Sequence, residues 1–330
     1  MSAAIRRYRQ LGRLPLTRFR IHLIAESPIE LPPYYGQTLR GGLAAAMRSN
    51  VCVTGMSTCE GCMLRRQCAY GVLFEPIPPS DDPTPQFADA PRPYVITVPY
   101  DPGRKRSQTL TPGSPLTFDL TLVGPAVPQL PYFVYSTMQL SRRGIGRQKG
   151  TARLERVTVA EEMQTDGTSE LFDGETLRAT PPALAGDDLS LSWDLSGTER
   201  LTVRFHTPIR LKLDGSYTCP LTFHDLMRGV VNRVKTLTRF YGEEVDPSAL
   251  EELLDAAREV RTVENRQTWW DLTRYSTRQK TRLKMGGAYG WATFEAEDFA
   301  PFAPLLALGE WLHIGKLTTM GLGRFEAMTE

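Results

Sequence analysis

Apolar side chains recur along this chain in two spacings: every second residue in some runs, and every third or fourth residue in others. Leu39, Leu43 and Met47 recur every four residues within the segment 38–47, which predicts a helix. A second helix is predicted at residues 129–140. Runs with the character of strands lie at residues 18–25, 93–99, 116–124 and 153–159. The first half therefore has the order β-α-β-β-α-β.

The second half shows the same pattern. It starts with an alternating strand at residues 200–213, followed by a strong helix at 222–241. The apolar stripe of that helix contains Phe223, Met227, Val230, Val231, Val234 and Leu237. The remaining predicted elements are an acidic helical insertion at 246–259, a basic strand at 278–284, a strand at 286–296, a helix at 302–312 and a strand at 323–328.

This repeated order predicts an α+β fold of two tandem ferredoxin-like (RRM-like) domains. The expected boundaries are residues 1–160 for the N-terminal domain, 161–199 for a linker and 200–330 for the C-terminal domain. The linker carries ten acidic residues against one basic residue, Arg178, and contains Pro181 and Pro182. Each domain has a Gly-rich basic loop between its second helix and its last strand, at 141–150 and 313–323.

The composition is that of a globular protein, with 330 residues, 41% hydrophobic residues and a net charge of +2. The chain has no run of 18 apolar residues, and its N-terminus lacks the apolar core of a secretory signal. We therefore expect a cytoplasmic protein without a membrane partner. Since the linker holds ten of the 37 acidic residues, the rest of the chain is clearly basic.

The segment "HIGKLTTMGLGRFE" (313–326) contains Gly315, Gly321 and Gly323, more glycines than a simple turn needs. Bare N–H groups in such a loop bind phosphate, and Lys316 would add a positive charge. The spacing of nucleotide-binding loops is absent. A plain turn between helix and strand is the alternative.

Four of the five cysteines, Cys52, Cys59, Cys62 and Cys68, lie within 17 residues, in an insertion at about 50–75. The Cys59-x-x-Cys62 spacing is typical of a structural zinc site, which Cys52 and Cys68 complete. An iron–sulfur cluster and unligated thiols are the alternatives. Because four thiolates leave no open position for water, this metal would stabilise the insertion and take no part in catalysis.

Basic residues occur in two clusters, which include the loop at 141–150 and the predicted strand at 278–284. On a strand at 278–284, alternate residues point to one face, and RNA phosphates would relieve the repulsion among their charges. Trp269, Trp270 and Tyr275 lie nearby in sequence and are able to stack bases. An exposed edge strand protected by charge is the alternative. The candidate contacts to RNA are Arg142, Arg143, Arg147, Lys149, Arg228, Arg274, Arg278, Lys280, Arg282 and Lys284.

Several segments together resemble the CRISPR repeat-processing endoribonucleases of the RAMP superfamily, in their Cys-containing branch. In the C-terminal half these are "FHDLMRGVVNRVKTLTRFYG", "GGAYGWATFEA" and "LLALGEWLHIGKLTTMGLGRFE". In the N-terminal half they are "LPPYYGQTLRGGL", "CEGCMLRRQCAYGVLFEP" and "LPYFVYSTMQLSRRGIGRQKG". The resemblance covers nearly the whole chain.

The resemblance implies a protein that binds the repeat of a CRISPR precursor transcript and cuts it to give mature guide RNA, with other Cas subunits as further partners. It also implies cleavage without a metal cofactor, by attack of the 2′-OH to leave a 2′,3′-cyclic phosphate. A non-catalytic RNA-binding RAMP subunit is the alternative, and a zinc-dependent DNA-binding protein is a third. Many family members carry a catalytic histidine on or just before the first helix, and this sequence has none there.

Such a reaction needs a proton acceptor, a proton donor and cations around the phosphate. Of the four histidines, His22 and His206 lie in strand patterns and are expected to be structural. His224 lies in the first turn of a helix that Thr222 caps, where an imidazole favours its neutral form and anions bind. The full set of catalytic candidates is His224, His313, Lys316, Tyr34, Tyr35 and Arg40, with Arg228 one turn after His224.

Overall fold

The computed structural model describes residues 14–78, 90–160, 170–178, 194–243, 245–276 and 281–329. The chain folds as two compact units that divide near residue 184. Each unit is described by itself below.

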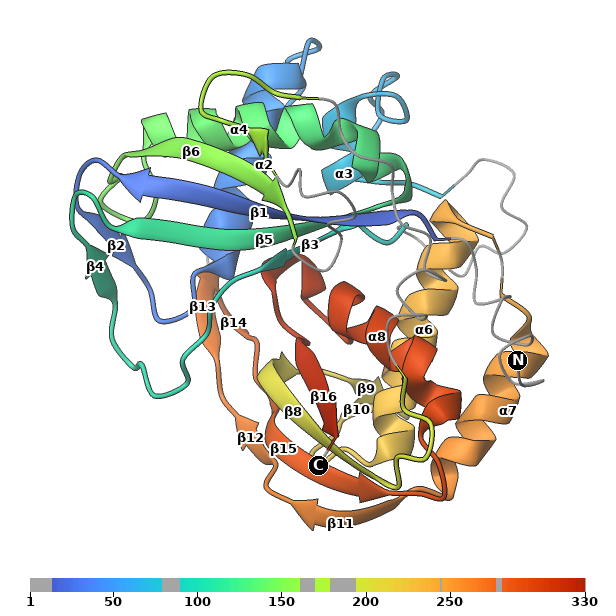
Figure 1. The fold of residues 1–330 in the computed structure, drawn as a ribbon. Coiled ribbons are helices and arrows are strands. Elements are labelled where there is room, and N and C mark those ends of the chain that lie inside the picture. The colour runs from blue at the N-terminus through green and yellow to red at the C-terminus, as the bar shows by residue number, and fades with distance from the viewer. Residues whose placement is uncertain are drawn as a thin grey trace. The chain divides into compact units, whose positions relative to one another are not determined.

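The N-terminal unit is built on an antiparallel sheet of five strands in the order β3-β5-β1-β6-β7. Two helices, α2 (Gly36–Val51) and α4 (Leu130–Arg143), cover one face of this sheet (Figure 1). The strands are β1 (Leu16–Ala25), β3 (Tyr94–Thr97), β5 (Pro115–Val123), β6 (Ala152–Val159) and β7 (Glu170–Phe172). Because β1 lies between β5 and β6, the unit has ferredoxin-like topology, as predicted.

Strict alternation along β1 determines which face of the sheet forms the core. Phe19, Ile21 and Leu23 are at most 1% exposed, whereas the residues between them are half-buried on the opposite face. The short helix α3 (Ala69–Phe74) adds Phe74, whose ring lies 5.1 Å from that of Tyr94. The helix η1 (Gly124–Gln129) leads into α4, and a pair of short strands, β2 (Ile29–Leu31) and β4 (Gln108–Leu110), completes the unit.

The C-terminal unit repeats this topology, with the sheet order β11-β15-β8-β16. Its strands are β8 (Arg200–Ile209), β11 (Arg261–Asn265), β15 (Gly287–Glu295) and β16 (Phe325–Thr329), and β12 (Thr268–Trp270) also pairs with β15. The helices α6 (Phe223–Tyr241) and α8 (Ala303–Leu312) pack on one face of the sheet, and α7 (Pro247–Arg258) lies beside α6 (Figure 1). The prediction of an α+β fold with two ferredoxin-like units is therefore confirmed.

Helix α6 begins where the sequence predicts, because its first turn is capped. The Thr222 hydroxyl accepts from the Asp225 N–H at 3.1 Å, and the Asp225 carboxylate accepts from the Thr222 N–H at 3.0 Å. Phe223 then enters the core, where its ring lies about 5 Å from those of Phe294 and Phe302. The cap thus fixes the position of the first turn relative to the core.

The predicted basic strand at 278–284 does not belong to the C-terminal sheet. Its described part, β14 (Thr281–Lys284), pairs with β13 (Thr273–Ser276) in a separate two-stranded sheet, and Arg278 and Lys280 lie outside the described residues. The strand next to β15 is instead β11, whose five residues are all exposed. An exposed edge strand without apolar alternation leaves no periodic signal, so the sequence could not reveal it.

Short elements connect the larger ones in this unit. They are the strands β9 (Lys212–Leu213) and β10 (Ser216–Tyr217) and the helices η3 (Ala300–Phe302) and η4 (Thr318–Met320). None of the helices within the described ranges has the length and apolar character that crossing a membrane demands.

Candidate functional site

The glycine loop, residues 313–323, is held by backbone contacts within its own domain. The Ile314 N–H donates to the Gly323 carbonyl oxygen at 3.0 Å, and the Gly323 N–H donates to that of Pro208 at 3.1 Å. The Lys316 N–H donates to the Arg210 carbonyl oxygen at 3.0 Å. These bonds place the loop against the end of β8.

Close approach of main-chain carbonyls explains two of the glycines. A Cβ atom at Gly315 would lie 2.5 Å from the carbonyl oxygen of Arg210, and one at Gly323 would lie 1.9 Å from that of Ile314. Both residues have positive φ, as does Gly321 at the end of η4. The chain itself therefore supplies a reason for these glycines that differs from the phosphate contact expected from the sequence.

The equivalent loop of the N-terminal unit, residues 141–150, is built in the same way. Cβ atoms at Gly146 and Gly150 would lie 2.2 Å and 2.1 Å from the carbonyl oxygens of Glu30 and Pro28. This packing against β2 and the residue before it leaves the basic side chains outside. Arg142, Arg143, Arg147 and Lys149 are all exposed, so their charges are available to an anion in solvent.

The glycine loop encloses His313. This residue has a φ of 53°, its side chain is fully buried, and its Nδ1 lies 3.2 Å from the Leu322 carbonyl oxygen. An imidazole in this position has no surface to offer a substrate, contrary to the predicted contact with phosphate. The neighbouring Lys316 is exposed.

His224, in contrast, is half-buried in the first turn of α6. Burial lowers its pKa from the usual value of 6.5, and the guanidinium of Arg258 on α7 lowers it further. Arg228, one turn along α6, adds to this effect and pairs with Asp214 at 3.4 Å. Asp225 and Asp255 act in the opposite direction, and the net lowering of the pKa favours the neutral imidazole, which is able to accept a proton.

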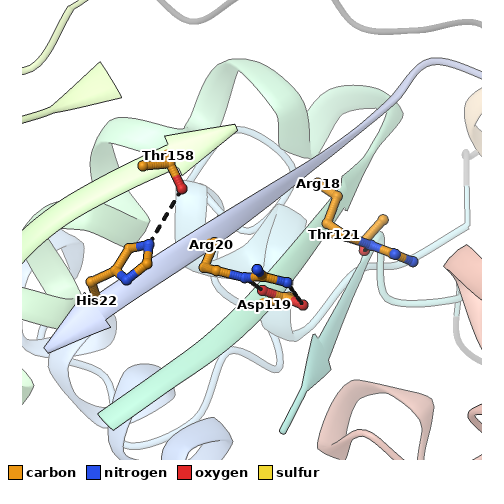
Figure 2. A network of polar contacts seen from close by, with 6 residues as sticks. All are labelled: Arg18, Arg20, His22, Asp119, Thr121 and Thr158. Atoms are coloured by element: carbon orange, nitrogen blue, oxygen red, sulfur yellow. Dashed lines mark hydrogen bonds and ion pairs between the residues drawn. The ribbon is translucent and has the colours of Figure 1, made fainter. Parts of the chain in front are cut away.

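A second polar cluster lies on the half-buried face of β1, on the side away from the helices (Figure 2). The Arg20 guanidinium makes a bidentate pair with Asp119, at 2.8 and 3.3 Å, and the Arg18 Nε donates to the Thr121 hydroxyl at 3.2 Å. His22 Nε2 lies 3.3 Å from the Thr158 hydroxyl on β6. Alternation in "RFRIH" is the sequence signal that places these three basic side chains on one face.

Sequence reasoning treated His22 as structural and missed its electrostatic setting. Burial lowers the pKa of His22, and the charges of Arg156 and Arg20 lower it further. His22 is therefore a second half-buried imidazole that favours the neutral form. His206 differs, since its Nε2 lies 2.6 Å from the Glu326 carboxylate across β8 and β16.

Tyr34 and Tyr35 precede α2 and are 2% and 5% exposed. Tyr34 packs edge-on against Tyr100, with ring centroids 5.3 Å apart, which assigns it to the core. Tyr35 lines a cavity of about 380 Å³ together with Arg104 and Thr117. Burial raises the pKa of Tyr35 to about 12, so its phenol stays protonated near neutral pH and is suited to donate a hydrogen bond, not to act as a base.

The guanidinium of Arg40 is directed into the N-terminal unit. It lies 5.4 Å from the ring centroid of Phe74, and its Nε is buried without a hydrogen-bond partner. Arg40 therefore packs against the core, and the predicted role of a cation beside the substrate finds no support in this arrangement. Lys284, at the end of β14, is exposed.

The four clustered cysteines are brought together between α2 and α3. Cys52, Cys59, Cys62 and Cys68 are all half-buried, and all line one cavity of about 240 Å³. Within the described ranges, no three potential ligand side chains are close enough as placed to hold a metal ion. The structure thus gathers the predicted ligands around one space without closing a coordination sphere.

Comparison with known proteins agrees with this architecture. Residues 14–184, more than half of the chain, match the family model AF_1859_N, described as an N-terminal domain. Residues 203–325 match the family model of the CRISPR-associated endoribonuclease Cas6. An uncharacterized protein of Archaeoglobus fulgidus is 24% identical over 315 residues, which are 94% of this chain and 97% of the relative.

Solved structures show the same fold at low sequence identity. A Cas6 product complex matches with a TM-score of 0.57 at 16% identity, covering 95% of this chain and all of the other. The Thermus thermophilus Cas6 matches with a TM-score of 0.55 at 15% identity, over 96% and 99% of the two chains. A partial Cas6-RT-Cas1–Cas2 complex matches with a TM-score of 0.59 at 12% identity, over 97% of this chain and 47% of the other.

The two ferredoxin-like units, together with the match of residues 203–325 to the Cas6 model, are those of a protein of RAMP type. The chain belongs to the AF_1859_N family, and its second half carries a Cas6 endoribonuclease domain. The resemblance to CRISPR repeat-processing proteins noted from the sequence is thereby confirmed.

Proposed function

We propose that this protein is an endoribonuclease that cleaves the repeat RNA of a CRISPR precursor transcript, once per repeat, without a metal cofactor. The observation that carries the proposal is the match of residues 203–325 to the Cas6 endoribonuclease family, on a domain with the complete ferredoxin-like topology. The exposed basic residues of the two glycine loops support RNA as the ligand, because phosphates would neutralise them.

The proposed reaction is an in-line transesterification. The 2′-oxygen forms a bond to phosphorus as its proton passes to a base, and the bond from phosphorus to the 5′-oxygen breaks as that oxygen takes a proton. The products are a 2′,3′-cyclic phosphate and a 5′-hydroxyl. Cations around the phosphorus stabilise the charge that develops there.

We assign the proton-transfer role to His224. Its neutral imidazole is accessible, and Arg228 and Arg258 provide positive charge beside it. The capped first turn of α6 fixes its position. His313 is the weaker candidate because it is fully buried.

RNA containing the repeat of a CRISPR array from the same genome provides the test. We expect cleavage at one site in the presence of excess EDTA, and a cyclic phosphate on the 5′ product. A single 2′-deoxy nucleotide on the 5′ side of the cut should abolish the reaction and leave binding intact. Cleavage of that deoxy RNA, or a requirement for magnesium, would contradict the mechanism.

The second candidate function is a non-catalytic RNA-binding RAMP subunit of a CRISPR effector complex. It is favoured by one observation: α2 (Gly36–Val51) and the residues just before it contain no histidine. In the same assay this protein would bind the unmodified repeat tightly and leave it uncut.

A further inference from the structure

The Cys segment, residues 52–68, joins α2 to α3 and has no hydrophobic core. It contains no helix or strand, and none of its 17 residues is buried. Val53 and Met63 are 82% and 90% exposed. Ordering a residue costs about 1–2 kcal/mol in backbone entropy, and burial of side chains does not offset that cost here. Some other interaction must hold the segment in one conformation.

The cysteines are the inward-facing part of this segment. Only six of its residues are half-buried, and four of these are Cys52, Cys59, Cys62 and Cys68. All four line the 240 Å³ cavity between α2 and α3. Thus the four side chains whose chemistry is the binding of soft metal ions face one shared cavity.

The backbone also prepares the thiols for one common centre. Cys52 is the C-cap of α2 and Cys68 is the N-cap of α3, so both are fixed by helix ends. The Cys62 N–H donates to the Cys59 carbonyl at 3.3 Å, which forms a tight turn between these two thiols. The Thr54 hydroxyl lies 3.8 Å from the Sγ atoms of both Cys52 and Cys62, so these two thiols lie near one common point.

We propose that the Cys segment binds one structural Zn²⁺ through the thiolates of Cys52, Cys59, Cys62 and Cys68. Tetrahedral zinc holds sulfur at about 2.3 Å, which requires neighbouring sulfurs about 3.8 Å apart. The thiols do not form such a set in the structure, so zinc binding requires their side chains to rotate about χ1 between staggered positions. Binding releases the four thiol protons.

Two arginines stand where the negative charge of a four-thiolate zinc centre needs compensation. Arg65 lines the cavity, and its Nε donates to the Glu75 carbonyl at 2.9 Å. Arg48, in the last turn of α2, donates to the Met56 carbonyl and so ties the segment to the helix. Since four protein ligands leave no position for water, the zinc stabilises the N-terminal unit and does not act on RNA. This inference stands independently of the proposed ribonuclease activity.

The experiment is metal analysis of the full-length protein, purified without a histidine tag. We expect one equivalent of zinc per chain, released when a mercurial reagent titrates the thiols. The variant with Cys59→Ser and Cys62→Ser should lose the zinc, and limited proteolysis should then cut within residues 53–63. Cys219→Ser is the matched control, because Cys219 is half-buried in the other unit and should leave the zinc content unchanged.

Replacement of zinc by Co²⁺ in the wild-type protein gives a second readout that does not require the variant to fold. Four thiolates should produce intense sulfur-to-cobalt charge-transfer bands and the d–d bands of a tetrahedral site. Protein that contains no metal and four free thiols, two disulfides in place of the thiols, or iron with inorganic sulfide would each overturn the proposal.

Discussion

A Cβ atom placed on Gly323 would lie 1.9 Å from the carbonyl oxygen of Ile314, and the Ile314 N–H in turn donates to the Gly323 carbonyl at 3.0 Å. These two residues close the base of the glycine loop through their backbones. A side chain at Gly323 would have to separate them, which opens the loop that encloses His313. The loop therefore has a structural role in the C-terminal unit that does not depend on any binding surface.

Gly323→Ala should accordingly destabilise the C-terminal unit by more than about 2 kcal/mol, since it combines a backbone clash with a φ of 81°. Urea denaturation measures the loss. Gly113→Ala is the matched control, because Gly113 has a φ of 87° and open space around its Cβ position. It should cost only the strain of positive φ, about 1–2 kcal/mol. Equal losses for the two variants would refute the role of the Ile314 contact.

Thr222→Ala should lower stability by about 1 kcal/mol, because it removes the hydroxyl that caps the first turn of α6. Thr222→Ser keeps a hydroxyl acceptor at the same position and should lose little stability. Thermal unfolding compares the two variants. If alanine and serine behave alike, the capping bond is not what stabilises this turn.

His224→Ala should reduce the single-turnover cleavage rate by about 10² to 10⁴, the usual contribution of general acid–base catalysis, with RNA affinity nearly unchanged. His206→Gln serves as the control, since His206 pairs with Glu326 away from α6, and we expect a change of only a few-fold. If His224→Ala, His313→Ala and Tyr35→Phe all cut within a few-fold of wild type, catalysis depends on orientation and cations.

The pH dependence of cleavage offers a separate test of His224. Burial and the charge of Arg258 disfavour the imidazolium and lower the pKa of His224 below 6.5, so the neutral base predominates at pH 7. The rate should fall only as the pH drops through that lowered pKa. Arg258→Gln removes a positive charge, which raises the pKa and should move the acid limb of the profile to higher pH. If the acid limb of the profile does not move, a group other than His224 determines it.

The basic residues of the segment 278–284 should contribute to RNA affinity through phosphates. Neutralising Arg278, Lys280 and Arg282 together should weaken binding and reduce the slope of log K against log salt by about 2, at ~0.7 per contact with single-stranded RNA. The control neutralises Arg153, Arg261 and Arg266, each paired with a carboxylate. A slope that changes equally in both variants would indicate a general effect of net charge.

The candidate site was only partly accessible from sequence. The spacing of the cysteines and the basic character of the loops are local features, so they could be recognised directly. The environment of each histidine is not local. His313 lies beside a glycine loop in sequence, yet the loop folds over it and buries it. His22 has the pattern of an ordinary strand residue, and its lowered pKa comes from burial and from the charge of Arg156, on a neighbouring strand.

By itself the sequence determined the two β-α-β-β-α-β units, because burial of one face imposes a period on each long helix and strand. The period is visible in the sequence of β1, at Phe19, Ile21 and Leu23, and in the apolar stripe of α6. Tertiary structure alone decided that β13 and β14 pair with each other in a separate two-stranded sheet and that the exposed β11 joins the sheet of β15. It also decided which glycines lie against a main-chain carbonyl oxygen and that His313 is buried whereas His224 is partly exposed. These outcomes depend on contacts between residues far apart in the chain, and such contacts leave no periodic trace in the sequence.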